Sequence, residues 1–333
     1  MRHALSALLI LWSAAAAAQS AFEIEEERLF DAPGTAVVRI VSTTDTDLFA
    51  PIVTAFQAAN PEIDVHYTTA ATTEVHRAVE SGAAFDLAIS SAMDLQMKLA
   101  NDGLALPAPG PADWPRLARW RDEVWAFAQE PVVAAFAPRA FEGMLPRTRS
   151  DLIDALRRDP ERFQGKVGTY DPNRSGAGYL FATQDARQSD TSWRLAEVMG
   201  GLDPRLYAST AAMLRDLREG RILVAYNLLG SYATADGFAG VEMLDFTHVL
   251  LRTALVPRSA PAPDLGRAFL RFLLSPEGQA AVAATGLPPI DADALTRAPH
   301  LRPIRLDAGL LVYVDPLVRG RFLREWTEAV RQP

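Results

Sequence analysis

Apolar and polar positions along the chain alternate between the spacing of strands and the spacing of helices. Residues 37–41 form a compact apolar run that predicts a buried strand, and residues 48–56 then carry apolar side chains at helical spacing as far as Asn60 and Pro61. The same change of period follows twice more, with strands expected at 64–68 and 85–89 and helices at 72–79 and 93–100. Because strands that alternate with helices pair in parallel, this part of the chain predicts a parallel sheet.

A second unit is predicted after a proline-rich stretch at residues 107–115. Its expected elements are strands at 124–127 and 132–136, a helix capped by Ser150 and reaching 156, a strand at 165–170, a helix at 209–217 and a strand at 222–228. An apolar run at 249–256 ends at Pro257, as a strand returning to the first unit would, and Ser275 with Pro276 begins another helix.

This order of elements predicts an α/β protein of two lobes with a cleft between them. Lobe 1 would comprise residues 36–129 and 255–333, and lobe 2 residues 130–254. A single large doubly wound sheet is the alternative.

The first residues predict an export signal. Arg2 and His3 precede a short apolar stretch at 4–12, and alanines at 16–18 form an A-x-A cleavage site, so residues 1–18 are expected to be a signal peptide. The alternative is an uncleaved anchor, but the stretch is shorter than the ~20 residues of a membrane-spanning helix. The mature chain would begin near Gln19 with an acidic leader that is expected to be solvated.

Composition narrows the function classes. The chain has 333 residues, a formal net charge of −8 and no run of Lys or Arg, which argues against nucleic acid as a partner. It contains no cysteine, which excludes disulfides, thiolate metal sites and a lipidated cysteine anchor. No nucleophile elbow, Walker A loop, G-x-G-x-x-G or H-E-x-x-H motif occurs, and the five histidines are scattered. We therefore expect a binding protein, not an enzyme.

Hydroxyl-bearing residues and glycines recur where the expected strands end and helices begin, at 42–46, 72–73, 90–91, 173–178 and 230–232. In open α/β sheets the carboxyl ends of strands border the ligand crevice, and helix N-termini there offer unpaired N–H groups and partial positive charge. Such a crevice suits an anion, and Arg174 would add a fork of donors that matches carboxylate or phosphate.

Specific strings extend this picture: VSTTDT at 41–46, SSAMDLQMKLANDG at 90–103, GKVGTYDPNRSGAG at 165–178, AYNLLGSYA at 225–233, FLLSPEGQ at 272–279, and the segment 302–326. They resemble the periplasmic solute-binding proteins of ABC importers, in the branch of ferric-iron, phosphoglycerate and sugar-phosphate types. The resemblance covers nearly the whole mature chain. It implies the two-lobed type II periplasmic-binding fold, with a ligand cleft between the lobes and closure around a ligand that an inner-membrane permease then accepts.

The resemblance implies a periplasmic monomer that binds a small phosphorylated or carboxylate anion without a cofactor. The candidate contacts are Thr43, Thr44, Thr72, Thr73, Ser90, Ser91, Arg174, Ser175, Gly176, Ser231 and Tyr232. Ferric-binding relatives carry two adjacent tyrosines, a pair absent here, so Fe³⁺ held by Tyr232 and Tyr226 is the alternative. Some resembling proteins present their ligand to a membrane sensor kinase instead of a permease, which is a second alternative for the partner.

Overall fold

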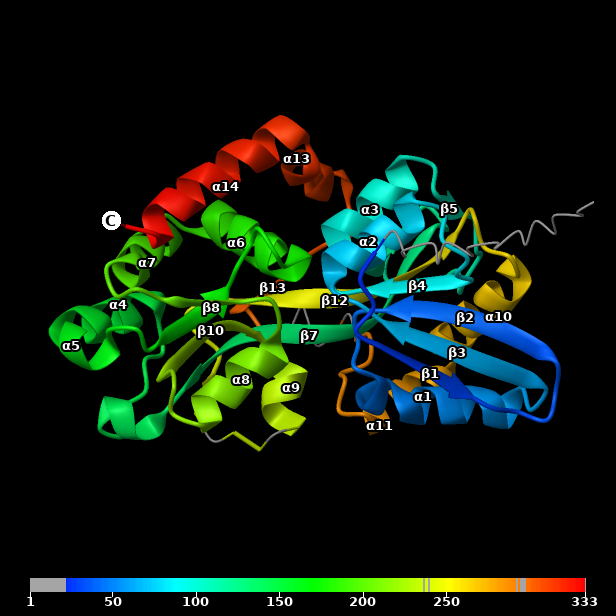
Figure 1. Ribbon diagram of the computed structural model, residues 1–333, viewed down its shortest axis with the longest axis horizontal. Coiled ribbons are helices and arrows are strands. Elements are labelled where there is room, and N and C mark those ends of the chain that lie inside the picture. Colours follow the sequence, from blue (N-terminus) through cyan, green and yellow to red (C-terminus); the bar gives the residue numbers. More distant parts are fainter. Residues whose placement is uncertain (1–21, 236, 239, 292, 294–297, 333) are drawn as a thin grey trace, which may run out of the picture.

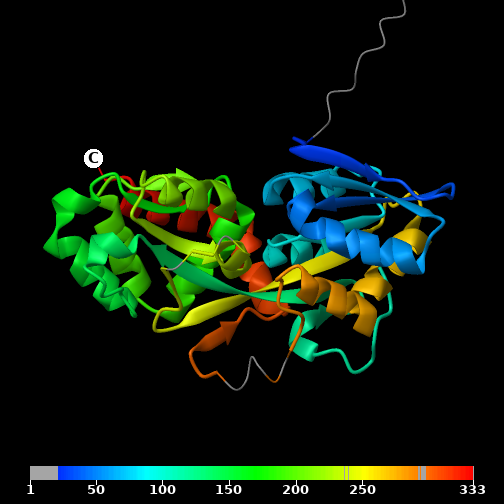
Figure 2. The same ribbon diagram turned by 90° about the horizontal axis from the view of Figure 1, so that it is seen from below.

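Two lobes, each built on a sheet with helices on both faces, share one pair of long strands in the computed structural model (Figures 1 and 2). The structure describes residues 22–235, 237–238, 240–291, 293 and 298–332. The expected signal peptide at 1–18 therefore lies outside the described residues. In the described part of the chain, no helix combines the length and the apolar character that a membrane crossing requires.

Lobe 1 contains the parallel sheet that the sequence predicts. Its strands are β1 (Glu26–Phe30), β2 (Ala36–Ser42), β3 (Ile63–Thr69), β4 (Leu87–Ser90) and the short β5 (Ala105–Leu106). Its helices are α1 (Thr46–Ala59), α2 (Thr72–Glu80), α3 (Met93–Asn101), α10 (Pro263–Leu274) and α11 (Pro276–Ala284). Strand β2 pairs in parallel with both β3 and β4, which confirms the predicted pairing.

The glutamates of the acidic leader are exposed, but its backbone pairs with lobe 1. Glu26 begins β1, which pairs antiparallel with β3, and the backbone N–H of Glu25 donates to the carbonyl of Thr69 at 2.8 Å. The backbone N–H of Glu23 donates to the carboxylate of Glu74. The leader is therefore an edge strand of lobe 1. Its charges face water while its backbone completes the hydrogen bonding of β3, a long-range pairing that a local pattern does not reveal.

The two lobes are joined by β7 (Val124–Phe136) and β12 (Thr247–Pro257), which pair antiparallel between residues 125–131 and 249–254. The first half of β7 lies beside β12 where β12 also pairs with β4 of lobe 1, and the second half pairs with β10 of lobe 2. The sequence predicts two strands here because Gln129-Glu130-Pro131 interrupts the apolar run. They form one strand because Glu130 is neutralised by a buried partner, described below.

Lobe 2 follows the predicted order with shifted ends. Its strands are β8 (Val167–Tyr170), β9 (Arg205–Tyr207), β10 (Val224–Leu229) and β11 (Val241–Glu242). Its helices are α4 (Arg149–Arg158), α5 (Pro160–Phe163), α6 (Gly176–Gln188), α7 (Thr191–Gly200), α8 (Thr210–Arg218) and α9 (Gly230–Ala235). The cap of α4 is Thr148, not Ser150, because Thr148 and Asp151 form a reciprocal capping box.

The C-terminal segment departs from the predicted division into lobes. Its elements are β13 (Leu301–Pro303), the 3₁₀ turn η3 (Ala308–Leu310), α13 (Leu311–Val314) and α14 (Pro316–Val330). Helix α13 packs on α3 of lobe 1, whereas α14 packs on α7 of lobe 2, so the segment arches from one lobe to the other (Figure 1). The end of the chain thus covers lobe 2, where Phe322 and Trp326 join its core.

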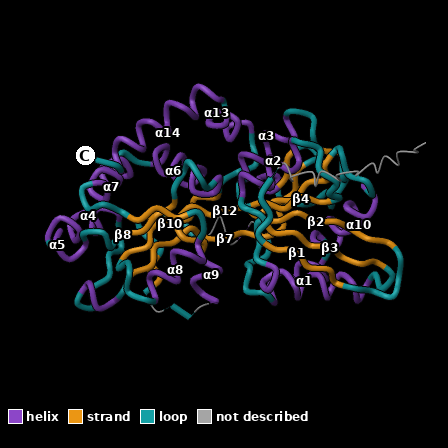
Figure 3. Tube along the Cα trace, viewed as in Figure 1, coloured by secondary structure: helices purple, strands orange, loops and turns teal. Residues whose placement is uncertain are grey.

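Strands form the middle layer of both lobes, and helices cover them on either side (Figure 3). The short elements η1 (Arg116–Ala118), β6 (Arg119–Trp120) and η2 (Pro138–Phe141) border β7 or extend from it. The core of lobe 1 is rich in aromatic rings; Phe49 stacks on Tyr67 at a centroid distance of 4.9 Å, and Phe56 packs on Phe269 at 4.4 Å. This aromatic core belongs to lobe 1, whereas a second buried cluster continues from lobe 1 past the ribbon of β7 and β12 into lobe 2.

Candidate functional site

A cavity of about 340 Å³ lies between the two lobes, where the carboxyl ends of the lobe 1 strands meet lobe 2. Lobe 1 contributes to its wall the polar residues Glu25, Thr43, Asp45, Thr72 and Ser91, and lobe 2 contributes Tyr170, Ser175, Ser209, Thr210 and Tyr232. No Lys, Arg or His is among the described residues that line it. The volume falls in the range of small-molecule sites, and the wall offers mainly hydroxyl groups.

Several helices begin at this cavity, and those of lobe 1 lack side-chain caps. The N-cap residues of α1, α2 and α3 are Asp45, Ala71 and Ala92, and none of them accepts a hydrogen bond from its own helix through its side chain. Alanine has no side-chain acceptor, so the first turn of α2, which borders the cavity at Ala71 and Thr72, keeps backbone N–H groups for another partner. In lobe 2, by contrast, Ser175 and Ser209 cap α6 and α8.

Five of the candidate contacts line the cavity: Thr43, Thr72, Ser91, Ser175 and Tyr232. The hydroxyls of Thr43 and Ser91 are 3.3 Å apart, and the Ser91 N–H donates to Thr43 Oγ1 at 3.0 Å, so the ends of β2 and β4 are locked together. The cavity wall therefore brings together strand-to-helix junctions that lie far apart in the sequence.

A hydrogen bond closes one side of the cavity between the lobes. The backbone N–H of Gly176, in lobe 2, donates to Thr72 Oγ1, in lobe 1, at 2.7 Å. A Cβ at position 176 would come within 2.9 Å of Leu95 and 3.1 Å of Thr72 Oγ1, so glycine is what permits this approach of α6 to α2 and α3. Gly176 thus acts in the contact between lobes.

Three other candidate hydroxyls are turned into the protein. Thr44 Oγ1 accepts from Arg252 Nη1, Ser90 Oγ accepts from the Ala92 N–H at 3.0 Å, and Ser231 Oγ donates to Glu130 Oε2. All three residues are buried and none lines the cavity. Their polar atoms already have partners, so the structure assigns them to holding the walls in place.

Thr44 and Ser231 meet at a buried ion pair in the connecting ribbon. Arg252 of β12 donates from Nε to Glu130 Oε1 at 2.9 Å, and both side chains are fully buried. Burial opposes the charge of Arg252, but the carboxylate of Glu130 more than offsets this and raises the arginine pKa above its usual value. Thr44 belongs to lobe 1 and Ser231 to lobe 2. The Arg252–Glu130 ion pair therefore connects both lobes to the ribbon in which the chain crosses between them.

Arg174 and Thr73 lie beside the cavity wall without forming part of it. Arg174 is exposed in the turn before the cap of α6, and Thr73 is half-buried in the first turn of α2. Neither is among the lining residues. The structure therefore does not place the predicted guanidinium inside the cavity, because the Asp171–Ser175 turn, held by backbone bonds from Arg174 and Ser175 to the Asp171 carbonyl, leaves the side chain outside.

The sequence analysis missed two carboxylates in the wall, Glu25 and Asp45. Desolvation raises the pKa of Glu25, and the nearby charge of Asp45 adds to this. Desolvation also raises the pKa of Asp45, while Arg252 and a hydrogen bond from Tyr232 oppose that rise. Asp45 belongs to the junction motif at 41–46 and could have been included; Glu25 reaches the cavity only because β1 pairs with β3.

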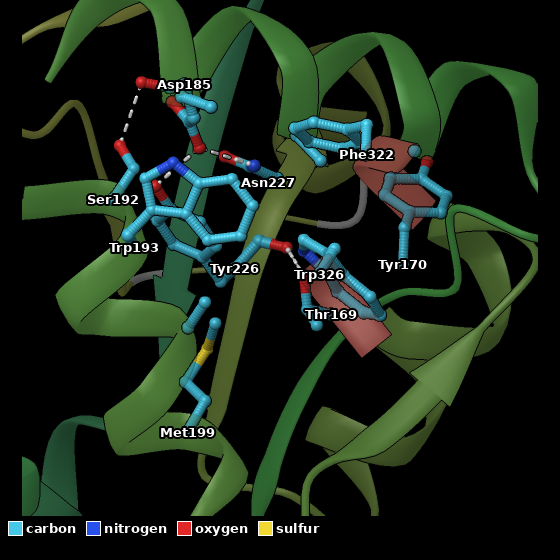
Figure 4. A pocket seen from close by; sticks show the side chains of 14 residues that line it. Thr169, Tyr170, Asp185, Ser192, Trp193, Met199, Tyr226, Asn227, Phe322 and Trp326 are labelled. Atoms are coloured by element: carbon cyan, nitrogen blue, oxygen red, sulfur yellow. Dashed lines mark hydrogen bonds between the residues drawn. The ribbon is translucent and has the colours of Figure 1, made fainter. Parts of the chain in front are cut away.

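Tyr226 lies inside lobe 2, away from Tyr232. Its hydroxyl accepts from Arg149 Nε and donates to Asp185 Oδ2, each at 2.7 Å, and Asn227 Nδ2 donates to the same oxygen at 2.9 Å. Tyr226, Asp185 and Asn227 are drawn together in Figure 4. A bulge in β10, with Asn227 at φ +65°, turns these consecutive side chains to one carboxylate. Tyr226 lines a small internal pocket, not the inter-lobe cavity, so the structure separates the two tyrosines of the iron alternative.

The remaining tyrosines in the cavity wall are Tyr170 and Tyr232. Burial raises the pKa of Tyr232 to about 12, and Tyr170, also buried, hydrogen-bonds the Thr210 hydroxyl at 2.6 Å. Both phenols are therefore neutral near pH 7 unless a cation displaces the proton. Among the described residues, no group of three or more His, Asp or Glu side chains is arranged to hold a metal ion.

Comparisons with known proteins agree with this geometry. The family described as "Bacterial extracellular solute-binding protein" matches residues 38–287, about three quarters of the chain. The substrate-binding protein of an ABC transporter from Agrobacterium tumefaciens is 33% identical, with 93% of this chain and 99% of that chain covered and a TM-score of 0.88. No curated protein sequence matches the chain.

More distant solved structures share the fold. The periplasmic binding protein AfuA from Actinobacillus pleuropneumoniae, solved with fructose-6-phosphate, has a TM-score of 0.71 at 16% identity, covering 90% of this chain and 100% of that one. Iron-bound HitA from Pseudomonas aeruginosa has a TM-score of 0.64 at 18% identity, covering 89% and 99%. These two likenesses support the two-lobed fold.

Proposed function

Because this chain belongs to the bacterial extracellular solute-binding proteins of ABC transporters, which bind substrates and are not enzymes, we propose that it captures a small organic anion in the inter-lobe cavity and delivers it to a membrane permease. Capture would take place in the periplasm, after export by the predicted signal peptide. The observation that carries the anion is the uncapped first turn of α2 at the cavity.

The wall favours a ligand with several acceptor oxygens. The free N–H groups of α2 and the positive end of its dipole attract negative charge. The hydroxyls of Thr43, Thr72 and Ser91 add donors from the same lobe, and Thr210 and Tyr232 add donors from the other. Hydrogen bonds to a charged group contribute about 1.5–3 kcal/mol each, so four or five offset the entropy losses and leave roughly the 8 kcal/mol of a micromolar complex.

The connecting ribbon supplies a mechanism for delivery. Contacts from both lobes to one ligand exist only when the lobes are together, so a ligand shifts the population toward the closed form. The Gly176–Thr72 bond joins the two walls in this way. A permease that recognises both lobes at once would then distinguish loaded from empty protein.

Titration calorimetry with phosphate monoesters and small carboxylates tests the proposal. Thr72→Val removes a hydroxyl from the wall, and we expect about tenfold weaker binding of the anion that binds best. Thr54→Ala, an exposed hydroxyl on α1 that bonds only the Ala50 carbonyl, is the matched control and should leave affinity unchanged. If no anion binds and none raises the unfolding temperature, the proposal is wrong.

Ferric iron remains the second candidate, on a different donor set from the one expected. Tyr170, Tyr232, Glu25 and Asp45 all line the cavity, and phenolate and carboxylate oxygens are hard donors suited to Fe³⁺. Iron binding would displace the tyrosine protons and give a coloured protein. Visible absorption after addition of ferric citrate, lost in Tyr232→Phe and retained in Tyr226→Phe, would favour iron over an organic anion.

A further inference from the structure

Asp94 has a carboxylate that is buried and only partly hydrogen-bonded. It lies in the first turn of α3, and only 1% of its surface is exposed. Its Oδ1 accepts from the Leu95 N–H at 2.9 Å, whereas its Oδ2 is buried without a partner among the residues that the structure describes. Burying an acceptor without a partner is costly, and the cost is larger when the acceptor is charged. The surroundings of Asp94 therefore favour a neutral carboxyl over a carboxylate.

Part of this burial comes from lobe 2. Ala92 and Leu95, on either side of Asp94 in the sequence, both lie against Gly176 of α6; a Cβ built on Gly176 would be 3.1 Å from the Ala92 Cβ and 2.9 Å from the Leu95 Cδ1. Helices α6 and α13 both contact α3, on one side of the molecule (Figure 1). Since α3 belongs to lobe 1 and α6 to lobe 2, opening the lobes would withdraw α6 from the start of α3 and admit water to Asp94.

Within the described chain, no charged group bonds the Asp94 Oδ2. Arg319 of α14 is the cation whose charge lowers the pKa of Asp94, but its Nη1 is also buried without a partner. Burial outweighs this charge and raises the pKa of Asp94 to about 6. The other titratable groups on the elements that contact α3 have partners elsewhere: Glu74 with Arg77, His76 with Glu80, Lys98 with Asp102, Glu130 with Arg252, Asp185 with Arg149 and His248, Arg187 with Gln184, and Tyr179 with the carbonyl of Tyr313.

We propose that closure of the lobes is coupled to the uptake of a proton by Asp94, so that the protein closes more readily in mild acid than at neutral pH. Closed lobes bury Asp94 and favour its neutral carboxyl, whereas open lobes hydrate it and favour the carboxylate. The form that binds the proton more tightly gains stability as the pH falls. This inference goes beyond the proposed function, since it concerns the movement of the lobes and holds for any solute.

The size of the effect follows from the two proton affinities of Asp94. Its pKa is about 6 with the lobes closed, and an aspartate in water has a pKa of about 3.9. Between these values only the closed form takes up the proton, so the closed form gains on the open form as the pH falls. Lowering the pH from 7.5 to 5.0 should therefore shift the closing equilibrium about tenfold toward the closed form.

Spin labels on the two lobes measure this equilibrium without a ligand. The chain has no cysteine, so Thr54→Cys on α1 and Arg215→Cys on α8, both at exposed positions, accept one label each. These helices belong to different lobes, and both begin at the cavity. In pulsed electron resonance, we expect the ratio of the closed to the open distance population to be about tenfold higher at pH 5.0 than at pH 7.5. An unchanged ratio, or one unchanged distance at both pH values, overturns the inference.

Asp94→Asn identifies the group that titrates, with Asp102→Asn as the matched control at the exposed end of the same helix. Asparagine retains an acceptor for the Leu95 N–H but takes up no proton. We expect the ratio in Asp94→Asn to be the same at both pH values and well above the wild-type ratio at pH 7.5, whereas Asp102→Asn keeps the tenfold change. A pH response that persists in Asp94→Asn would assign the coupling to another group and refute the inference.

Gly176→Leu tests whether the contact between the lobes is what buries Asp94. The leucine side chain does not fit between α6 and the start of α3, so it should hold the lobes apart and keep Asp94 hydrated. In chemical denaturation at pH 8, we expect Asp94→Asn to stabilise the wild-type protein but not the Gly176→Leu protein. An equal gain in both backgrounds would mean that lobe 1 alone buries Asp94 and that its protonation is not coupled to closure.

Discussion

Ala71 is the position where stability and ligand affinity should change in opposite directions. It is the N-cap of α2, has φ −59° and ψ 155°, and lines the cavity without offering a side-chain acceptor. Serine at an N-cap stabilises a helix by about 1 kcal/mol relative to alanine. Ala71→Ser should therefore raise the unfolding temperature of the ligand-free protein by about 1–2 °C in a one-step transition.

The same hydroxyl would occupy the N–H groups that we assign to the anion. We expect Ala71→Ser to weaken the best-binding phosphate ester several-fold, and Ala71→Asp, which adds a negative charge at the same place, to weaken it at least tenfold. Ala262 is a matched control because it is the uncapped N-cap of α10, outside the cavity. Ala262→Ser should leave affinity unchanged.

Differential scanning fluorimetry without ligand and calorimetry with the phosphate ester measure the two effects separately. If Ala71→Ser stabilises the free protein and leaves anion affinity at the wild-type value, the first turn of α2 does not bind the anion. If it strengthens binding, the serine hydroxyl is itself a ligand contact, and the reasoning from free N–H groups fails.

Three further results are expected. Glu130→Gln leaves the fully buried Arg252 without its counter-charge, so chemical denaturation should show a loss of about 3–5 kcal/mol and poorer coupling of ligand binding to lobe closure; a loss below 1 kcal/mol would contradict this. Burial raises the pKa of Asp94 to about 6, above its value in the unfolded chain, so the stability that its protonated carboxyl provides is present below the unfolded pKa and is lost as pH rises through 6. Asp94→Asn should therefore raise the free energy of unfolding by about 3 kcal/mol at pH 8 and leave it unchanged at pH 3. A gain in stability that does not vary with pH would refute this. Tyr226→Phe should lower stability without changing anion affinity, whereas Tyr232→Phe should lower affinity, and the reverse pattern would place the site in lobe 2.

Asp94 lies close to a cation of the C-terminal helix α14, Arg319. It lies on α3 of lobe 1, with Oδ2 buried and without a hydrogen-bond partner, and Arg319 of α14 is the cation whose charge lowers its pKa. Arg319 lies over the ring of Tyr179, in lobe 2, at 4.2 Å. The C-terminal arch thus brings a charge carried on lobe 2 toward a carboxylate of lobe 1, and Arg319→Leu should raise the pKa of Asp94 further.

Local patterns predicted the elements well because they depend on residues close in sequence. The strand–helix alternation from β2 to α3 and the start of α11 at Ser275 and Pro276 have the expected places. Predictions from local patterns failed where a residue distant in sequence determined the structure. The sequence around Glu130 predicts a break between two strands, but Arg252, far along the chain, pairs with Glu130 and one strand forms.

In the candidate site, too, local sequence predicted some features and long-range contacts decided others. Sequence placed hydroxyls at the ends of strands, and Thr43, Thr72 and Ser91 do line the cavity. It could not show which hydroxyls face inward, because Thr44 is adjacent to Thr43 and differs only in pointing to Arg252. Nor could it show the bulge at Asn227, where Tyr226 and Asn227 both bond the carboxylate of Asp185.

The sequence by itself determined the class of fold, the resemblance to solute-binding proteins and the junctions at which a ligand would be met, since these follow from periodicity and from contiguous strings. Only the tertiary structure decided the charge of the cavity. Glu25 enters it through the pairing of β1 with β3, while Arg174 remains outside it, so two carboxylates line a wall where one guanidinium was expected. The physical reason is that charge at a site depends on which distant residues share one small volume, and the local pattern of a chain carries no information about that.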